Sequence, residues 1–321
     1  MDLAQKIVEA AVRIAPHIRE TYLEHSAFYS GITGANVFLK LENLQFTGSF
    51  KLRGALNKIL SLDKAQLDNG VITASTGNHG AAVAFASSIV GTKAVVFVST
   101  KASKSKVDAI RRHGAEVREF GDDPIEAENF ARDYASENSI PYISPYNDID
   151  VVAGQGTVGV EISEQLGNID VVFVAVGGGG LISGIGAFLK SFDPKIRIVG
   201  CSPENSKVMI QSLEMGELRG DLPSLPTLSD GTAGGIEDGS ITFDLCRDII
   251  DETVTVTEDE IISAMCDFAD VHHMQIEGAA AVATASFMKT AEKYRGKNVV
   301  LVICGANIGA ETLGEVLIQR N

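Results

Sequence analysis

The amino-acid sequence predicts an α/β protein of two lobes, with parallel-rich sheets flanked by helices. Strand-like apolar runs alternate with helix-like segments, which is the pattern of parallel sheets joined by crossover helices. The alternation comes in two consecutive series, and glycine-rich turns follow strands of both series. Ligands of such folds bind beyond the carboxyl ends of the strands. We therefore expect a binding cleft between the two lobes.

The elements can be assigned in order from the hydrophobic pattern and the turn residues. A strand-like run at 37–42 is followed by a helix that begins near Lys51. In the first series we expect strands at 70–74, 94–98 and 116–120, with helices at 81–90, 104–113 and 124–138. In the second series we expect strands at 170–176, 197–201 and 299–303. A capping box at 257–260 begins another helix, and the Gly-, Pro- and Ser-rich residues 216–239 are expected to form a long ordered excursion.

The composition excludes several classes of protein. A formal net charge of −15 argues against nucleic-acid binding, which needs clustered Lys and Arg side chains. No apolar run reaches the roughly 18 to 20 residues that span a bilayer, and the N-terminus does not resemble a signal peptide. The four cysteines lie far apart without a CxxC pair, so neither a disulfide framework nor a zinc site is predicted. We expect a cytoplasmic protein that binds no membrane.

Lys51 is the first candidate for catalysis. It follows Phe50 at the junction between a strand-like run and a helix. A lysine amine can form a Schiff base with an aldehyde cofactor, and partial burial lowers its pKa enough to make it nucleophilic. The Phe50 ring would cover one face of a flat cofactor. For this segment alone, a lysine that projects into solvent is the alternative.

Four consecutive glycines, Gly177, Gly178, Gly179 and Gly180, form a second candidate site with Leu181. They follow an apolar strand and precede a helix. Without side chains, successive backbone N–H groups can converge on an anion at the helix N-terminus. This pattern favours a phosphate-binding loop over a simple tight turn.

A separate GxGxxG motif occupies residues 154–159. The run before it is short, and no clear ribose-binding acid follows about 20 residues later. We interpret these glycines as allowing a helix to pack closely, with a nucleotide-binding module as the alternative.

The third candidate is a polar turn made of Ser75, Thr76, Gly77, Asn78 and His79. It places hydroxyl, amide and backbone donors at a helix N-terminus, where they can bind a carboxylate. The alternative is a helix cap, for which one of the two hydroxyl residues is sufficient. His79 by itself is more typical of a structural hydrogen bond than of a catalyst.

Together these motifs resemble the fold-type II pyridoxal-phosphate enzymes, particularly the serine/threonine dehydratase and serine racemase family. The resemblance covers nearly the whole chain and depends on motifs at residues 49–55, 75–80, 153–157, 177–181 and 304–307. It implies a fold like that of the tryptophan synthase β subunit, a homodimer, and pyridoxal 5'-phosphate as cofactor. The implied domains are a large cofactor-binding domain at 1–69 and 148–321 and a small mobile domain at 70–147 that closes on the substrate.

The resemblance also implies roles for matching residues that surround the cofactor. Lys51 would hold the cofactor and act as general base, with Phe50 against its ring and Asn78 on its phenolic oxygen. Cys304 would face the pyridine nitrogen. Glu277 matches an acidic residue near the cofactor, although capping of the helix that follows is an equal alternative. The phosphate would be held by the backbone of Gly177, Gly178, Gly179, Gly180 and Leu181.

The implied reaction is dehydration and deamination of a β-hydroxy amino acid, such as L-threonine or L-serine, to a 2-oxo acid and ammonia. Ser75, Thr76, Gly77, Asn78 and His79 would bind the substrate. Thr76, a candidate catalytic residue, stands where racemases carry a serine that protonates the second face of the substrate. Because its hydroxyl is bulkier and differently oriented, a racemase is the less favoured alternative. Dehydration of hydroxyaspartate or of a hydroxyectoine-derived amino acid is another. Enzymes that catalyse β-replacement usually have different amino-acid sequences at the lysine motif and at the carboxylate-binding turn.

Two positions bear on the side chain of the substrate. Tyr146 is expected to face the β-carbon, and it offers no positive charge for a second substrate carboxylate. Arg132 is expected to be exposed on the outer face of its helix. We therefore expect neutral substrates ahead of hydroxyaspartate. Relatives that bind Mg or Ca carry carboxylates where this chain has Ser202 and Val208, so no metal site is predicted.

Overall fold

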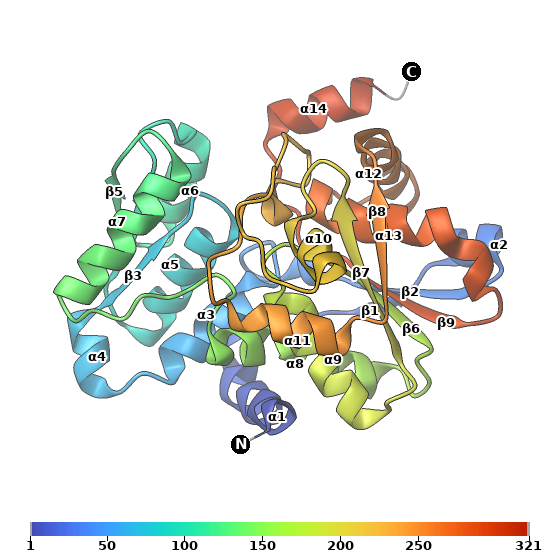
Figure 1. The fold of residues 1–321 in the computed structure, drawn as a ribbon, viewed down its shortest axis with the longest axis horizontal. Coiled ribbons are helices and arrows are strands. Elements are labelled where there is room, and N and C mark those ends of the chain that lie inside the picture. The colour runs from blue at the N-terminus through green and yellow to red at the C-terminus, as the bar shows by residue number, and fades with distance from the viewer. Residues whose placement is uncertain (1, 320–321) are drawn as a thin grey trace.

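The computed structural model describes residues 2–319 and contains two sheets (Figure 1). The larger sheet has six strands in the order β1-β2-β9-β6-β7-β8. Its neighbouring strands are parallel except for the antiparallel pair β1–β2. The strands are β1 (Leu23–His25), β2 (Asn36–Lys40), β6 (Val171–Ala175), β7 (Arg197–Pro203), β8 (Glu252–Val256) and β9 (Asn298–Val302). All five residues of β6 are apolar and buried, as expected for a central strand covered on both faces.

The smaller sheet is built from consecutive β-α units. Its three strands pair in parallel in the order β3-β4-β5. They are β3 (Val71–Ala74), β4 (Ala94–Val98) and β5 (Glu116–Glu119), and they are flanked by α5 (Asn78–Val90), α6 (Lys104–Arg112) and α7 (Pro124–Glu137). We call these six elements the small lobe, which lies to one side of the larger sheet in Figure 1. The domain boundaries at 69/70 and 147/148 stay a prediction.

The remaining helices lie against the larger sheet or join it to the small lobe (Figure 1). The α-helices are α1 (Leu3–Ile14), α2 (Ala27–Thr33), α3 (Lys51–Leu60), α4 (Lys64–Asn69), α8 (Ile149–Gln165), α9 (Gly180–Phe192), α10 (Val208–Met215), α11 (Ile241–Ile249), α12 (Glu258–His272), α13 (Gly278–Thr290) and α14 (Ala310–Ile318). The short 3₁₀ turns are η1 (Ala15–His17), η2 (Glu42–Leu44), η3 (Asp230–Thr232) and η4 (Ala291–Tyr294).

Close helix packing explains the GxGxxG motif. Residues 154–159 lie in the middle of α8, which is buried under α1, α3 and α9. A Cβ added at Gly154 would lie 2.5 Å from the carbonyl oxygen of Arg53, and one at Gly156 would lie 2.9 Å from that of Gly184. The packing interpretation is confirmed, because these glycines let helix backbones approach one another and do not form a strand-to-helix turn.

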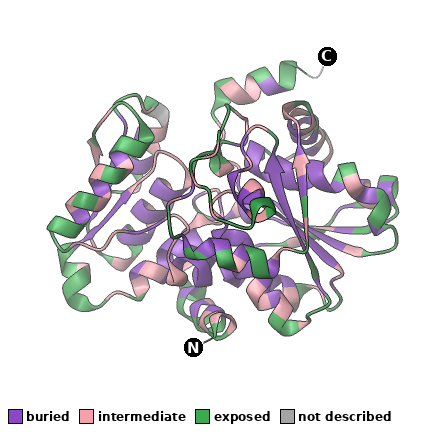
Figure 2. Cartoon of the chain, viewed as in Figure 1, coloured by how far each residue is buried: buried purple, intermediate pink, exposed green. Residues whose placement is uncertain are grey.

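The predicted strands and helices are present, with ends that differ by up to three residues. The capping box at Thr257 is formed with Glu260. Two strands were not predicted: β1 has only three residues, and β8 alternates buried and less buried positions. The inner strands of the large sheet and the helices beneath them form the main core (Figure 2). Within residues 2–319, no helix combines the length and the apolar character needed to cross a membrane.

Candidate active site

Lys51 is the first residue of α3, and its amine points into a partly buried site. Its Nζ donates a hydrogen bond to the Pro145 carbonyl oxygen at 2.9 Å and lies 5.3 Å from the centre of the Phe50 ring. Burial lowers the pKa of Lys51 from 10.5 to about 8, opposed by Cys304 and Glu277. The expectation of a partly buried lysine with a lowered pKa is therefore confirmed.

The end of β9 holds the segment before Lys51 in place. The Phe50 N–H donates to the Cys304 carbonyl oxygen at 3.1 Å, and Ser49 forms an isolated bridge with Gly305. Cys304 is 2% exposed, and burial raises the pKa of its thiol well above the usual value. The thiol is therefore neutral at physiological pH, and it lies in the same region as the amine.

Glu277 lies at the start of α13 but makes no side-chain cap there. Its carboxylate instead accepts both contacts of the Asn78 amide, at 2.8 and 3.0 Å, and the N–H of Asn307 at 3.0 Å. Burial, with a smaller contribution from Asp230, raises the pKa of Glu277 to about 7 in spite of these donors. The helix-capping alternative for Glu277 is wrong.

Asn307 completes this polar group and was not predicted as a site residue. Its side-chain amide donates to Asn78 Oδ1 at 2.5 Å and to the Thr47 carbonyl oxygen at 2.8 Å. Asn307 belongs to the same 304–307 motif as Cys304. Its position in this motif could have identified it as a site residue.

The four-glycine loop connects β6 to α9. Gly179 has a positive φ of 83°, and a Cβ there would lie 2.7 Å from the Cys246 sulfur. Thr242 donates to the Gly178 carbonyl oxygen at 2.6 Å, which turns the N–H of the following residue in the opposite direction. The first N–H groups of α9 have no acceptor within the helix. The loop thus has the backbone donors and the open backbone that an anion site needs.

Pro145 and Tyr146 lie between Lys51 and the glycine loop. The Pro145 carbonyl accepts from Lys51, and the Tyr146 ring is so close to Gly178 that an added Cβ would lie 2.4 Å from it. The Tyr146 hydroxyl accepts the Glu237 N–H at 3.1 Å, and burial raises its pKa to about 12. This short segment therefore contacts both the amine and the loop.

The polar turn of residues 75–79 precedes and begins α5. The Ser75 hydroxyl accepts the Gly77 N–H at 3.2 Å, while Gly77 is the N-cap residue and makes no side-chain cap. Ser75 and Thr76 are partly exposed, so a helix cap does not explain them. His79 is buried with its Nε2 2.9 Å from the Ile143 carbonyl oxygen, and burial, together with Lys51, lowers its pKa to about 3. The structural role expected for His79 is confirmed.

The η3 turn joins the two halves of the site, and the sequence did not identify it. A Cβ added at Gly177 would lie 2.9 Å from the Thr232 Cα, and one at Gly231 would lie 3.6 Å from a Glu277 oxygen. The Asp230 side chain pairs with Lys106 of α6 at 3.0 Å. In the sequence, the η3 turn was indicated only by its position within residues 216–239, which were expected to form a long ordered excursion.

Arg132 is not the exposed residue that was expected. Its guanidinium contacts Glu128 at 2.8 Å and Glu237 at 3.0 Å, and it lies 4.4 Å from the centre of the Tyr142 ring. Its side chain is 31% exposed. The expectation failed because Glu237 comes from a loop about 100 residues later in the chain, which local periodicity does not reveal.

Comparisons with known proteins agree with this geometry. The family model described as "Pyridoxal-phosphate dependent enzyme" matches residues 14–305. An L-threonine ammonia-lyase of Thermotoga maritima is 38% identical over 98% of this chain and 77% of its own length. The chain belongs to the family of pyridoxal-phosphate dependent enzymes.

Two solved structures are similar over almost the whole chain. The processed form of threonine deaminase isoform 2 from Solanum lycopersicum has a TM-score of 0.93 and 35% identity, covering 98% of this chain and 92% of that one. Serine racemase from Dictyostelium discoideum has a TM-score of 0.89 and 34% identity, covering 95% of this chain and 98% of that one. The predicted two-lobed fold-type II architecture is confirmed.

The residues around Lys51 fit pyridoxal 5'-phosphate, the cofactor of this family. An amine of lowered pKa suits the aldehyde, and the glycine-lined N-terminus of α9 suits the phosphate. The buried, neutral Cys304 thiol suits a ring nitrogen that is not held protonated. Within residues 2–319, no group of three or more His, Cys, Asp or Glu side chains is arranged to hold a metal ion.

Proposed function

We propose that this protein is a pyridoxal-phosphate dependent ammonia-lyase that converts a β-hydroxy amino acid, such as L-threonine or L-serine, to a 2-oxo acid and ammonia. The observation that carries the proposal is the Lys51 amine, held between Phe50 and the Pro145 carbonyl with its pKa lowered to about 8. The threonine ammonia-lyase and threonine deaminase named above support the same reaction.

Bound pyridoxal phosphate supplies an aldehyde that condenses with amines and a ring that accepts electrons from the substrate α-carbon. Lys51 provides the amine that holds the cofactor and, once released by the substrate, the base that removes the α-proton. A pKa near 8 leaves a useful fraction of this amine uncharged near neutral pH. The β-hydroxyl would leave as water, with a proton from the phosphate that the glycine loop would hold.

The other residues of the site would bind the cofactor and orient it. The backbone of Gly177, Gly178, Gly179, Gly180 and Leu181 would hold the phosphate, with Phe50 against the ring. Asn78 would donate to the phenolic oxygen in place of one of the two contacts that its amide makes with Glu277 here. Cys304 would face the ring nitrogen without protonating it, which weakens the electron sink and favours prompt elimination over a long-lived carbanion.

The substrate carboxylate would bind at the polar turn of Ser75, Thr76, Gly77, Asn78 and His79. Ser75 and Thr76 offer partly exposed hydroxyls, and His79 fixes the base of the turn through Ile143. Two cations near the site are already paired with carboxylates: Lys106 with Asp230, and Arg132 with Glu128 and Glu237. This supports substrates with a neutral side chain ahead of hydroxyaspartate or a hydroxyectoine-derived amino acid.

Racemisation is the second candidate function. The similarity to a serine racemase favours it, because a hydroxyl is present at Thr76. The β-methyl of threonine restricts its χ1 rotation, so the hydroxyl has fewer directions than that of serine. We therefore place elimination first.

The test is an ammonia-release screen of purified protein with pyridoxal phosphate, over serine, threonine and 3-hydroxyaspartate stereoisomers. We expect L-threonine or L-serine to be the best substrate, with visible absorbance from the bound cofactor. Lys51→Ala should abolish both signals, while Lys58→Ala, on the same helix, should keep them. A wild-type protein that never gains a visible band with pyridoxal phosphate would overturn the proposal. If hydroxyaspartate turns over at least tenfold more efficiently, the substrate assignment alone is wrong.

We also propose that the enzyme is a cytoplasmic homodimer in which the small domain, residues 70–147, moves against the single large domain formed by residues 1–69 and 148–321. The four cysteines are buried and form no disulfide, which supports a reducing compartment. The homodimer is inferred from the resemblance to the family. Light scattering on the purified protein would measure its mass in solution.

A further inference from the structure

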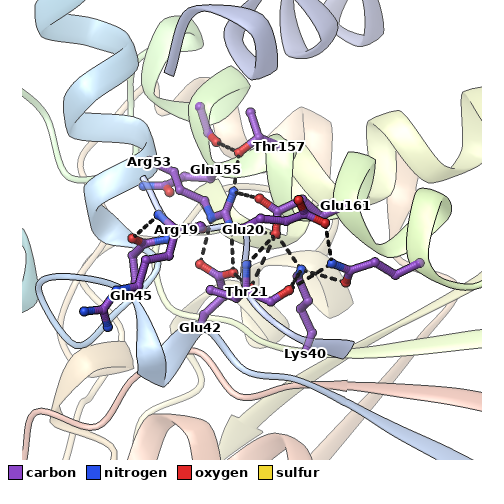
Figure 3. Close-up of polar contacts among 12 residues, drawn as sticks. Arg19, Glu20, Thr21, Lys40, Glu42, Gln45, Arg53, Gln155, Thr157 and Glu161 are labelled. Atoms are coloured by element: carbon purple, nitrogen blue, oxygen red, sulfur yellow. Dashed lines mark hydrogen bonds and ion pairs between the residues drawn. The ribbon is translucent and has the colours of Figure 1, made fainter. Parts of the chain in front are cut away.

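A buried cluster of charges surrounds Arg53, which follows Lys51 by two residues in α3 (Figure 3). Its centre is Arg53, whose side chain is 0% exposed. Arg53 Nε and Nη2 donate to the two oxygens of Glu42, each at 2.8 Å. Its Nη1 and Nη2 also donate to the two oxygens of Glu161, at 2.6 and 2.9 Å. One guanidinium thus binds two carboxylates through paired hydrogen bonds.

The positive charge of Lys40 balances the negative charge of Glu161. Its Nζ lies 2.5 Å from Glu161 and donates to the Thr21 carbonyl oxygen at 2.7 Å. The Thr21 hydroxyl donates to Glu42 at 2.6 Å (Figure 3). The cluster therefore contains two cations and two carboxylates, so it carries no net charge while it is closed to water.

The four charged residues come from separate elements. Lys40 ends β2, Glu42 begins η2, Arg53 lies in the first turn of α3, and Glu161 lies in α8. The guanidinium fork has fixed directions, so it specifies how α3 is placed relative to the sheet and to α8. Apolar packing of α3 resists separation but is far less directional.

Stability alone is a weak reason for such a cluster. Burying ions carries a desolvation cost that their attraction often only offsets, and apolar replacements of similar size are often as stable. The N-terminus of α3 has no side-chain cap. Besides the Arg53 contacts, it is held by backbone contacts to Cys304 and Gly305, by the Lys51 amine on the Pro145 carbonyl, and by the Gly54 N–H, which donates to Gln155 Oε1 at 3.2 Å. Among these contacts, the paired hydrogen bonds of Arg53 to two carboxylates have the most strongly defined geometry.

We propose that Arg53, held by Glu42 and Glu161, is a positioning residue that sets the direction in which α3 presents Lys51 to the site. The inference rests on the proposed function of Lys51 as the cofactor-binding amine. Arg53 touches neither substrate nor cofactor in this account and acts only through the helix that it shares with Lys51.

The test compares the Arg53→Lys holoenzyme with the wild type. Lysine keeps the positive charge but lacks the guanidinium group that binds two carboxylates through paired hydrogen bonds. We therefore expect kcat to fall about 10- to 100-fold, with KM changed less than about threefold. The pH midpoint of the visible band of the bound cofactor should move by roughly half a unit or more, because the amine meets different neighbours. A residue that only stabilised the fold would lower the unfolding temperature and leave the midpoint and kcat unchanged.

Lys58→Met is the matched control. Lys58 lies in the same helix and pairs with Asp148 at 2.7 Å and Asp150 at 3.1 Å, two turns away from Lys51. It should lower stability without moving the band midpoint. If Arg53→Lys does not fold, Glu161→Gln is the second variant, because glutamine keeps the shape of the glutamate side chain and one hydrogen-bond acceptor for Arg53. It should change kcat and the band midpoint in the same direction but by less.

The outcomes separate the two hypotheses. An unchanged midpoint and kcat in folded Arg53→Lys or Glu161→Gln protein overturns the positioning role and leaves the proposed function intact. A wild-type protein without a Lys51-dependent visible band overturns the proposed function itself.

Discussion

The carboxyl group of Glu277 is 2% exposed, and two asparagines and a nearby amine surround it. Burial raises its pKa from 4.5 to about 7, so the folded protein binds more protons than the unfolded chain between these values. The stability that this group contributes is fully present below pH 4.5 and is lost as pH rises through about 7.

Glu277→Gln should therefore reduce the loss of stability of the cofactor-free protein between pH 4.5 and 7.5. The expected difference in free energy of unfolding across this range is on the order of 3 kcal/mol, measured by urea unfolding. Glu315→Gln, an exposed change, serves as the control. Equal pH slopes in the wild type and Glu277→Gln would contradict the buried-carboxyl explanation.

We propose that Thr76 decides between elimination and racemisation at a single side chain. Serine lacks the β-methyl, so its hydroxyl can rotate to more positions. Thr76→Ser should raise the ratio of inverted serine to ammonia by roughly tenfold or more, and Thr76→Ala should abolish inversion. Chiral chromatography of the products from L-serine gives this ratio. No inverted product in either the wild type or Thr76→Ser would show that the second face of the substrate has no acid at this position.

At the scale of an element, the glycine loop before α9 is constrained from outside as well as by its own backbone. The Tyr146 ring occupies the space that a side chain at Gly178 would need, and Thr242 fixes the direction of the Gly178 carbonyl. Both contacts come from segments distant in sequence.

Gly178→Ala should lower the affinity for pyridoxal phosphate about 10- to 100-fold, because its Cβ would lie 2.4 Å from the Tyr146 ring and the loop must shift. Equilibrium dialysis or absorbance titration measures the affinity. Gly167→Ala is the control, since nothing lies within 4 Å of its added Cβ. Unchanged affinity in Gly178→Ala would mean that the loop does not hold the phosphate.

At the scale of the whole molecule, two ion pairs connect the small lobe with the excursion at 216–239. They are Lys106–Asp230 and Arg132–Glu237, each 3.0 Å long. The same part of the excursion also touches the site, at Gly177 through Thr232 and at Tyr146 through Glu237. We propose that these pairs favour the arrangement in which the small lobe closes on the site.

Removing the Arg132–Glu237 pair should raise KM by up to about fivefold, since partly exposed pairs contribute roughly 0.2 to 1 kcal/mol. A double-mutant cycle of Arg132→Gln and Glu237→Gln should show coupling in KM that shrinks at high salt. Asp108→Asn, which breaks the Asp108–Arg111 pair inside the small lobe, should leave KM unchanged. Strictly additive single mutations would contradict a contribution of this pair to closure.

Local patterns in the sequence determined much of this protein. The alternation of β6 and α9 around four glycines, and the lysine at the start of α3, follow from apolar periodicity and the chemistry of glycine and lysine. These features are short-range, so the class of fold was predictable and Lys51 was a candidate, whereas the cofactor was predicted from the resemblance of five motifs to a known family. The short strand β1 was not, because three partly polar residues carry too little pattern.

Only the tertiary structure decided which distant side chains meet. Asn78 and Glu277 are separated by 199 positions, Arg132 pairs with Glu237 across the two lobes, and Arg53 meets Glu161 over 108 positions. No local period encodes such contacts, since they depend on how strands are ordered in the sheet and how helices pack on it. The capping role left open for Glu277 and the exposed position expected for Arg132 were wrong for that physical reason.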